Sequence, residues 1–180
     1  QPKAFSPVVQ NVVVMFGGTD PSNLNRLVYD AILASKGRFS KIRFYFITGI
    51  GYDNEGHGVV TRPEKNIFVY PNVPRVTKYL KEADLVILGQ GRSIFEVACM
   101  GVPAIVLSQN ERETTHSFAN MEHGFLNLGL GKDVDETLVT NTLQWLIQTS
   151  SVRKNMHDLM LKIPMKSGIT RVKNIILGEE

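Results

Sequence analysis

Five short runs of apolar residues, rich in valine, isoleucine and phenylalanine, set the strongest limit on how this chain folds. A strand with one face in water alternates apolar and polar residues, whereas a strand covered on both faces is apolar throughout. The runs are therefore predicted to form a mostly parallel sheet buried between two layers of helices. They read NVVVMFGG (11–18), IRFYFITG (42–49), NIFVYPN (66–72), DLVILG (84–89) and PAIVLSQ (103–109).

Segments with helical periodicity separate these runs, as an α/β fold requires. Ser22 or Asp20 is expected to cap the first helix, and Gly37 is expected to end it. The stretch from 50 to 65 has no periodicity and is predicted to be a long loop. A sixth strand is predicted at FLNLG (125–129). The predicted helices cover 23–37, 73–83, 93–101, 113–124, 134–150, 151–163 and 168–177.

The 180 residues suit a single domain, with a lead-in over 1–10 and further helices over 151–180. The net charge is +3 and the basic residues are scattered, so a nucleic-acid partner is not indicated. No apolar run is long enough to span a membrane, which leaves peripheral contact with a membrane surface open. The one cysteine, Cys99, allows no internal disulfide and agrees with a cytoplasmic location. The first residue is Gln, as expected of a piece of a longer protein.

Two glycine-containing loops are predicted to meet at one point of the sheet. With right-handed crossovers and the strand order 3-2-1-4-5-6, ligands bind where the order reverses, between the first and fourth strands. The first strand ends in GGT (Gly17, Gly18, Thr19), and the fourth ends in GQGRS, which supplies Gly89, Gly91, Arg92 and Ser93. Each loop leads into a helix, and helix N-termini present free N–H groups to anions. An anion or nucleotide site is therefore predicted, although neither loop has a dinucleotide or P-loop pattern.

Glu96 follows Ser93 by three residues, and two interpretations of this spacing remain open. The pair forms the S-x-x-E pattern of a capping box. Alternatively, the carboxylate accepts hydrogen bonds from the two hydroxyls of a ribose.

A polar segment, NERETTH (110–116), follows the fifth strand. It forms either a solvated helix start or the far wall of the crevice, where it would meet a sugar or phosphate. His116 is a weak candidate for a general acid or base. No metal-ligand spacing, cofactor motif or Ser/His/Asp set is present, so no metal or cofactor is expected. The wall residues would be Asn110, Glu111, Arg112 and Glu113.

Three segments together resemble the C-terminal half of GT-B-type nucleotide-sugar enzymes. They are VVVMFGGTDPSNL (12–24), the long stretch from VYPNVPRV to SQNERE (69–113), and HGFLNLGLG (123–131). The resemblance extends over about 11–147 and is most specific at E-x-A-x-x-G-x-P, from Glu96 to Pro103. The chain is most similar to UDP-sugar hydrolases of pseudaminic acid biosynthesis and to spore-coat polysaccharide biosynthesis proteins. The peptidoglycan lipid-linked GlcNAc transferase is a more distant relative.

The resemblance implies a Rossmann-like domain that holds the UDP part of a nucleotide sugar. In the family, the glutamate matching Glu96 binds the ribose hydroxyls. The loops matching Gly89–Ser93 and Gly17–Gly18 approach the diphosphate, and the segment matching Asn72 and Val73 reads the uracil. The segment matching Asn110–Glu113 faces the sugar.

This chain departs from the family in two respects. The family usually has a glycine pair followed by Ser or Thr where this chain has G-Q-G-R-S, so the diphosphate geometry and the nucleotide, UDP or CMP, remain open. Family members also need an N-terminal partner domain, which in the hydrolases supplies the catalytic base. The expected function is thus nucleotide-sugar binding within a glycosyltransferase or sugar-nucleotide hydrolase, with an inactive isolated fragment. The alternatives are a UDP-GlcNAc epimerase-like domain and a non-catalytic assembly domain.

Overall fold

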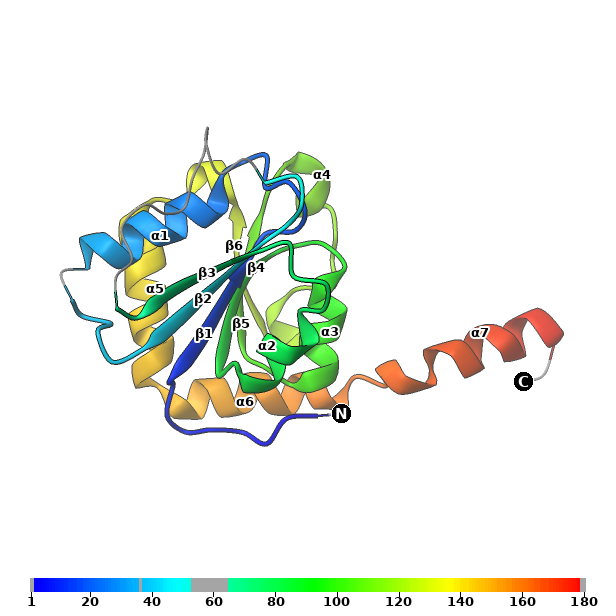
Figure 1. Ribbon diagram of the computed structural model, residues 1–180. Helices are drawn as coiled ribbons and strands as arrows, with labels where there is room; N and C mark the ends of the chain where they lie inside the picture. The colour runs from blue at the N-terminus through cyan, green and yellow to red at the C-terminus, as the bar shows by residue number, and fades with distance from the viewer. Residues whose placement is uncertain (1, 36, 53–64, 179–180) are drawn as a thin grey trace.

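The computed structural model describes residues 2–35, 37–52 and 65–178, and these form one sheet between two layers of helices (Figure 1). The six strands are all parallel and follow the order β3-β2-β1-β4-β5-β6. The predicted parallel sheet and its strand order are therefore confirmed. The strands are β1 (Asn11–Met15), β2 (Arg43–Thr48), β3 (Ile67–Pro71), β4 (Leu85–Gly89), β5 (Ala104–Ser108) and β6 (Phe125–Leu130).

Helices cover both faces of this sheet and cross one of its ends (Figure 1). The α-helices are α1 (Leu24–Ala34), α2 (Thr77–Glu82), α3 (Ser93–Met100), α4 (Glu111–Thr114), α5 (Glu136–Gln148), α6 (Ser150–Lys162) and α7 (Gly168–Leu177). Short 3₁₀ turns are η1 (Met121–His123), η2 (Gly131–Asp133) and η3 (Met165–Ser167).

Side-chain alternation along the strands divides the core into two layers. Val12 and Val14 of β1 pack with α1 and α5 on one face of the sheet. Val13 and Met15 point the other way and pack with α2 and α3. Since both layers are apolar, the central strands β1, β4 and β5 need apolar residues at nearly every position, which explains the runs in the sequence.

The predicted helix over 113–124 is wrong. The structure has only the one-turn helix α4 and the 3₁₀ turn η1 in this region. The hydroxyls of Thr114 and Thr115 each donate to the carbonyl three residues earlier, at 2.7 Å, and the amide of Asn120 donates to the carbonyl of Ser117 at 2.8 Å. Such local bonds compete with a continuous helix, and the periodicity of the segment did not reveal them.

Two other predicted boundaries differ from the structure. The helix predicted from 73 begins at Thr77, because the residue before Pro74 is restricted to extended backbone. The first helix ends at Ala34 and not at Gly37. The loop predicted over 50–65 lies mostly outside the described residues.

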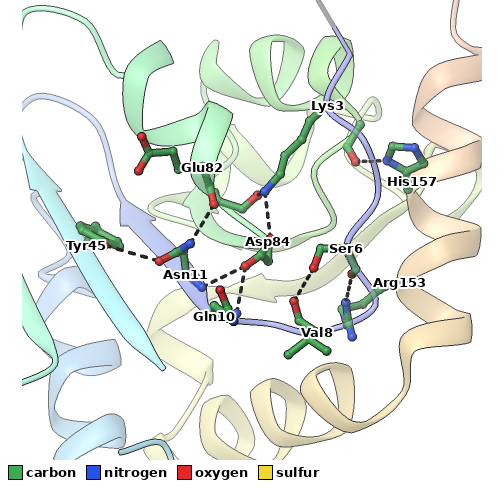
Figure 2. Close-up of polar contacts among 12 residues, drawn as sticks. Lys3, Ser6, Val8, Gln10, Asn11, Tyr45, Glu82, Asp84, Arg153 and His157 are labelled. Atoms are coloured by element: carbon green, nitrogen blue, oxygen red, sulfur yellow. Dashed lines mark hydrogen bonds and ion pairs between the residues drawn. The ribbon is translucent and has the colours of Figure 1, made fainter. Parts of the chain in front are cut away.

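Residues 2–10 run along the ends of the strands opposite the glycine loops, and Asp84 holds them there (Figure 2). One carboxylate oxygen of Asp84 pairs with the Lys3 ammonium at 2.9 Å. The other accepts the main-chain N–H groups of Gln10 at 2.9 Å and Asn11 at 3.0 Å. The expected lead-in is therefore an ordered strap that fixes the start of β1.

Arg153 of α6 holds the same strap from the other side (Figure 2). Its side chain is fully buried, and burial lowers the pKa of its guanidinium. The guanidinium donates to three main-chain carbonyls: Leu146 at 2.7 Å, Ser6 at 3.0 Å and Pro7 at 2.7 Å. These bonds replace lost hydration and tie the strap to α6 and to the last turns of α5.

The last helix, α7, extends away from the body of the domain (Figure 1). Its contacts are concentrated on the adjoining turn η3. Val172, Ile175, Ile176 and Leu177 each expose more than half of their surface. No helix among the described residues is both long and apolar enough to cross a membrane.

Candidate functional site

A cleft of about 340 Å³ lies at the carboxyl ends of β1 and β4. It stands at the predicted point, because β1 has β2 on one side and β4 on the other. Both glycine loops, the start of α3, Gln109 and Glu113 form its walls. The predicted residues that line it are Gly17, Gly18, Gly89, Gly91, Arg92, Ser93 and Glu113.

The loop after β4 presents unused hydrogen-bond donors at this cleft. The main-chain N–H groups of Gly91, Arg92 and Ser93 have no acceptor within the described part of the chain. Ser93 is the first residue of α3, so the positive end of the helix dipole also faces the cleft. The guanidinium of Arg92 is exposed and pairs with no carboxylate of the described residues. This wall is suited to an anion.

The loop after β1 is held by the loop after β2. Gly17 has a φ of 82°, a conformation that favours glycine. The carbonyl of Gly18 accepts the N–H of Gly51 at 3.0 Å. Thr19 turns toward the same β2 loop, since a Cβ on Gly51 would lie 2.8 Å from its Cγ2. Thr19 is accordingly not among the residues that line the cleft.

Asp20 occupies the N-terminus of α1, which alters one expectation from the sequence. Its buried carboxylate accepts the main-chain N–H groups of Leu24 at 2.9 Å and Asn25 at 2.8 Å. Of the two predicted caps, Asp20 accepts the N–H groups at the start of α1. The Ser22 hydroxyl donates instead to the carbonyl of Gln109. Because α1 already has an anion at its first turn, the free helix N-terminus that the described residues place at the cleft is that of α3.

Glu96 lies on the exposed side of α3, about one turn from the cleft. Ser93 is already helical and Arg92 occupies the N-cap position without a side-chain cap, so the predicted capping box is wrong. The Glu96 carboxylate bonds to no other described residue. It does not line the cleft itself and is free to meet a ligand that extends along α3.

Asn72 and Val73 also lie outside the cleft, at the end of β3. Asn72 has a φ of 49° and donates its N–H to the carbonyl of Thr48 at 2.8 Å. Val73 packs in the same apolar layer as Ile94 and Val97 of α3. Val73 is therefore on the face of the sheet that α3, the helix of Glu96, covers.

The segment after β5 is mostly engaged within the protein. Asn110 caps α4 by accepting the N–H of Glu113 at 3.0 Å, and Glu111 forms an exposed ion pair with Lys132 at 3.1 Å. The exposed Arg112 has no ion pair in the described structure and does not line the cleft. The predicted far wall thus contributes one lining residue, Glu113.

Glu113 holds two strand ends together. Its Oε2 accepts the N–H of Gln109 at 2.8 Å, just after β5, and the N–H of Gln90 at 3.3 Å, just after β4. These donors partly offset its negative charge. Glu113 therefore holds the two loops together, and its predicted contact with a sugar stays a prediction.

His116 is fixed by the loop after β4. Its Nδ1 lies 3.0 Å from the carbonyl of Gln90, and since a carbonyl only accepts, Nδ1 carries the proton in this contact. Its Nε2 is then left for another partner. The ring belongs to an exposed residue that is absent from the cleft lining.

Sequence reasoning missed two glutamines at the strand ends. Gln90 is almost fully buried, and its Oε1 accepts the Ser108 hydroxyl at 2.8 Å and the Asn127 amide at 3.0 Å. Gln109 lies between the two glycine loops and donates to the carbonyl of Phe16. Their signal was available, since each is the first residue after a strand, at the edge where ligands of such sheets bind.

The parallel doubly wound sheet, with its cleft at the switch point, places the chain among the Rossmann-like α/β domains. A family model narrows this class further. The model described as "Glycosyltransferase family 28 C-terminal domain" matches residues 12–167, so the chain belongs to this family.

Two relatives extend over much of the chain. An uncharacterized protein of Methanocaldococcus jannaschii, MJ1062, is 31% identical over 153 residues, which are 73% of this chain and 31% of that protein. The spore coat polysaccharide biosynthesis protein SpsG of Bacillus subtilis is 28% identical over 175 residues, or 93% of this chain and 50% of that protein. The chain thus spans about a third and a half of the length of these relatives.

Solved GT-B structures share the fold at low identity. A spinosyn rhamnosyltransferase complexed with thymidine diphosphate has a TM-score of 0.64 at 18% identity, covering 95% of this chain and 46% of the other. MurG of Acinetobacter baumannii has a TM-score of 0.63 at 16% identity, and the match covers 89% of this chain and 47% of MurG. The UDP-GlcNAc 2-epimerase of Neisseria meningitidis, bound to UDP-GlcNAc, has a TM-score of 0.68 at 9% identity. The match covers 94% of this chain and 45% of the epimerase. The chain therefore has the fold of one half of a GT-B enzyme.

Proposed function

We propose that this domain binds the nucleotide part of a UDP-sugar for a glycosyltransferase or sugar-nucleotide hydrolase. The pathway we propose is surface polysaccharide or nonulosonic acid synthesis. The observation that carries the proposal is the cleft between β1 and β4, where unpaired N–H groups and the start of α3 face the same space. The name of the B. subtilis relative, a spore coat polysaccharide biosynthesis protein, supports the proposed pathway.

The proposed ligand lies along one face of the sheet. Its diphosphate meets the loops of Gly17–Gly18 and Gly89–Ser93, with Arg92 as a movable counter-charge. Its ribose hydroxyls meet the carboxylate of Glu96, and its base reaches Asn72 and Val73. This order follows α3 from its first turn toward the layer that Val73 shares with α3. Arg112 and Nε2 of His116 are left for the sugar.

The catalytic groups, in this proposal, come mainly from an N-terminal partner domain that closes over the cleft. The chain spans a half or less of the relatives described above, which leaves room for such a domain. The contribution of this half is then to hold the donor in place and to stabilise charge on the diphosphate. For the compartment we propose the cytoplasm, because the lone Cys99 leaves no internal disulfide.

Calorimetric titration of UDP, CMP and UDP-GlcNAc into the chain tests the proposal. Wild type is compared with Glu96→Ala and with Glu122→Ala, a control that removes an exposed carboxylate of η1. We expect UDP binding that Glu96→Ala weakens about tenfold, or ~1.4 kcal/mol, while Glu122→Ala leaves it unchanged. Circular dichroism establishes that each variant is folded.

Two results would contradict the proposal. Tighter binding of CMP than of UDP would redirect the function to CMP-activated sugars. A folded wild-type chain that binds none of the three ligands would favour an assembly role for the domain.

A further inference from the structure

Gln109 contacts both sides of the cleft from the end of β5. Its Nε2 donates to the carbonyl of Phe16, where β1 leads into the first glycine loop. Its main-chain N–H donates to Glu113, which also holds the N–H of Gln90 after β4. Its main-chain carbonyl accepts the hydroxyl of Ser22, just beyond the first loop. One residue thus connects the ends of β1, β4 and β5.

The side chain of Gln109 lies in the gap between the two glycine loops. A Cβ on Gly17 would lie 3.9 Å from its Nε2, and a Cβ on Gly89 would lie 3.6 Å from the same atom. A methyl group at either glycine would only touch the amide, so the amide lies close beside both loops. It is tied to the first loop by its bond to the carbonyl of Phe16.

The other end of the amide is left unsatisfied. Oε1 of Gln109 is buried and has no hydrogen-bond partner among the described residues. A buried acceptor without a partner is unfavourable. Turning the amide over would not help, because Oε1 would then face the carbonyl of Phe16, and two acceptors repel. The amide therefore keeps its donor on Phe16 although its own oxygen is unpaired.

We propose that Gln109 is a positioning residue that fixes the spacing of the two glycine loops and thereby the affinity for the diphosphate. The inference rests on the proposed function, since it concerns the same ligand. Gln109 acts through Gly17–Gly18 and Gly89–Gly91, which contact the diphosphate in their turn. The base and ribose are read elsewhere, so the effect of Gln109 is confined to the diphosphate part.

A purely structural role makes a different prediction. If Gln109 only stabilised the fold, its loss would lower thermal stability and weaken every ligand alike. Gln109→Met keeps the length of the side chain, removes the bond to Phe16 and also removes the unpaired Oε1. These two effects oppose each other, so we expect a melting temperature close to that of wild type together with a misplaced loop.

The test compares UDP with uridine, which lacks the diphosphate. UDP is titrated by calorimetry and uridine by chemical-shift perturbation, into wild type, Gln109→Met and the control Gln148→Met on the exposed end of α5. We expect Gln109→Met to weaken UDP about tenfold, to leave uridine within about twofold, and to unfold within about 2 °C of wild type. Gln148→Met should behave as wild type in all three measurements.

A milder variant keeps the test decisive if Gln109→Met does not fold. Ser22→Ala removes only the hydroxyl that donates to the carbonyl of Gln109, and Ser22 is exposed. This variant should weaken the binding of UDP about twofold to threefold without changing the binding of uridine.

The outcomes separate this inference from the proposed function. The positioning role would be overturned if the variants bound UDP and uridine equally more weakly, or if UDP binding were unchanged in both variants. Binding of UDP by wild type would still uphold the proposed function. No UDP binding by folded wild type would overturn both.

Discussion

Gly18 and Gly49 meet through their backbones at the edge of the cleft: a Cβ on Gly49 would lie 2.3 Å from the Cα of Gly18. The two glycines follow β1 and β2, which are adjacent in the sheet. Real Cβ atoms do not approach backbone so closely, so any side chain on Gly49 must push the first glycine loop away from the loop after β2. The shape of the proposed diphosphate site thus depends on a glycine that does not itself line the cleft.

Gly49→Ala is expected to destabilise the chain by about 1–3 kcal/mol and to weaken UDP binding, because overpacking displaces the loop of Gly17 and Gly18. Chemical denaturation and calorimetry give the two quantities.

Gly91→Ala is the contrasting change in the facing loop. A Cβ on Gly91 meets nothing within 4 Å, and its φ is not in the left-handed region, so stability should change by less than about 0.5 kcal/mol. Because Gly91 lines the cleft, we expect the added methyl group to crowd the diphosphate and UDP to bind at least fivefold more weakly. Equal losses of stability in Gly49→Ala and Gly91→Ala would disprove the packing argument.

Much of this fold follows from local sequence, whereas the use of individual polar side chains does not. The five apolar runs predict the first five strands because burial on both faces leaves few polar positions, as in Leu85–Gly89, and the common doubly wound topology gives the strand order. The glycine loops follow from the same topology. The prediction of a helix over 113–124 failed because the hydroxyls of Thr114 and Thr115 donate to main-chain carbonyls of the same segment. Hydrophobic periodicity does not reveal such bonds.

The site was only partly predictable for a related reason. Sequence spacing gave equal weight to Ser22 and Asp20 as caps, and to capping and ligand binding for Glu96. Which of these occurs depends on backbone angles, such as the φ of 44° at Asp20, that are set by tertiary contacts. Gln109 and Glu113 follow β5 and so could be marked as candidates, but their partners after β1 and β4 are distant in sequence and do not follow from any local pattern.

Asp20→Ala should lower the free energy of unfolding by about 1–2 kcal/mol, because it removes the acceptor for the first N–H groups of α1. Asp20→Asn keeps one acceptor oxygen and tolerates the left-handed backbone, so it should cost about half as much. Urea unfolding of the two variants measures the difference. Similar losses in both would mean that the carboxylate does not act as a cap.

Arg153→Met should destabilise the chain by about 3 kcal/mol, since it leaves the carbonyl of the buried Leu146 without this donor and releases the strap at Ser6 and Pro7. Hydrogen exchange should rise first in residues 2–10, the strap that the guanidinium holds. The exposed Arg171→Met on α7 is the matched control and should change neither quantity. A destabilised variant whose strap remains protected from exchange would show that Arg153 acts elsewhere.

Truncation after Ser167, which keeps η3 and its contacts with α3, should leave the rest of the domain intact, because the contacts of α7 are concentrated on η3. The melting temperature should change by less than about 2 °C, since few buried apolar contacts are lost. Removing the exposed side chains of Val172, Ile175, Ile176 and Leu177 should also reduce self-association, which exposed apolar patches promote. Sedimentation velocity at several concentrations compares the truncated and full chains. A large fall in melting temperature on truncation would mean that α7 packs on the domain in solution.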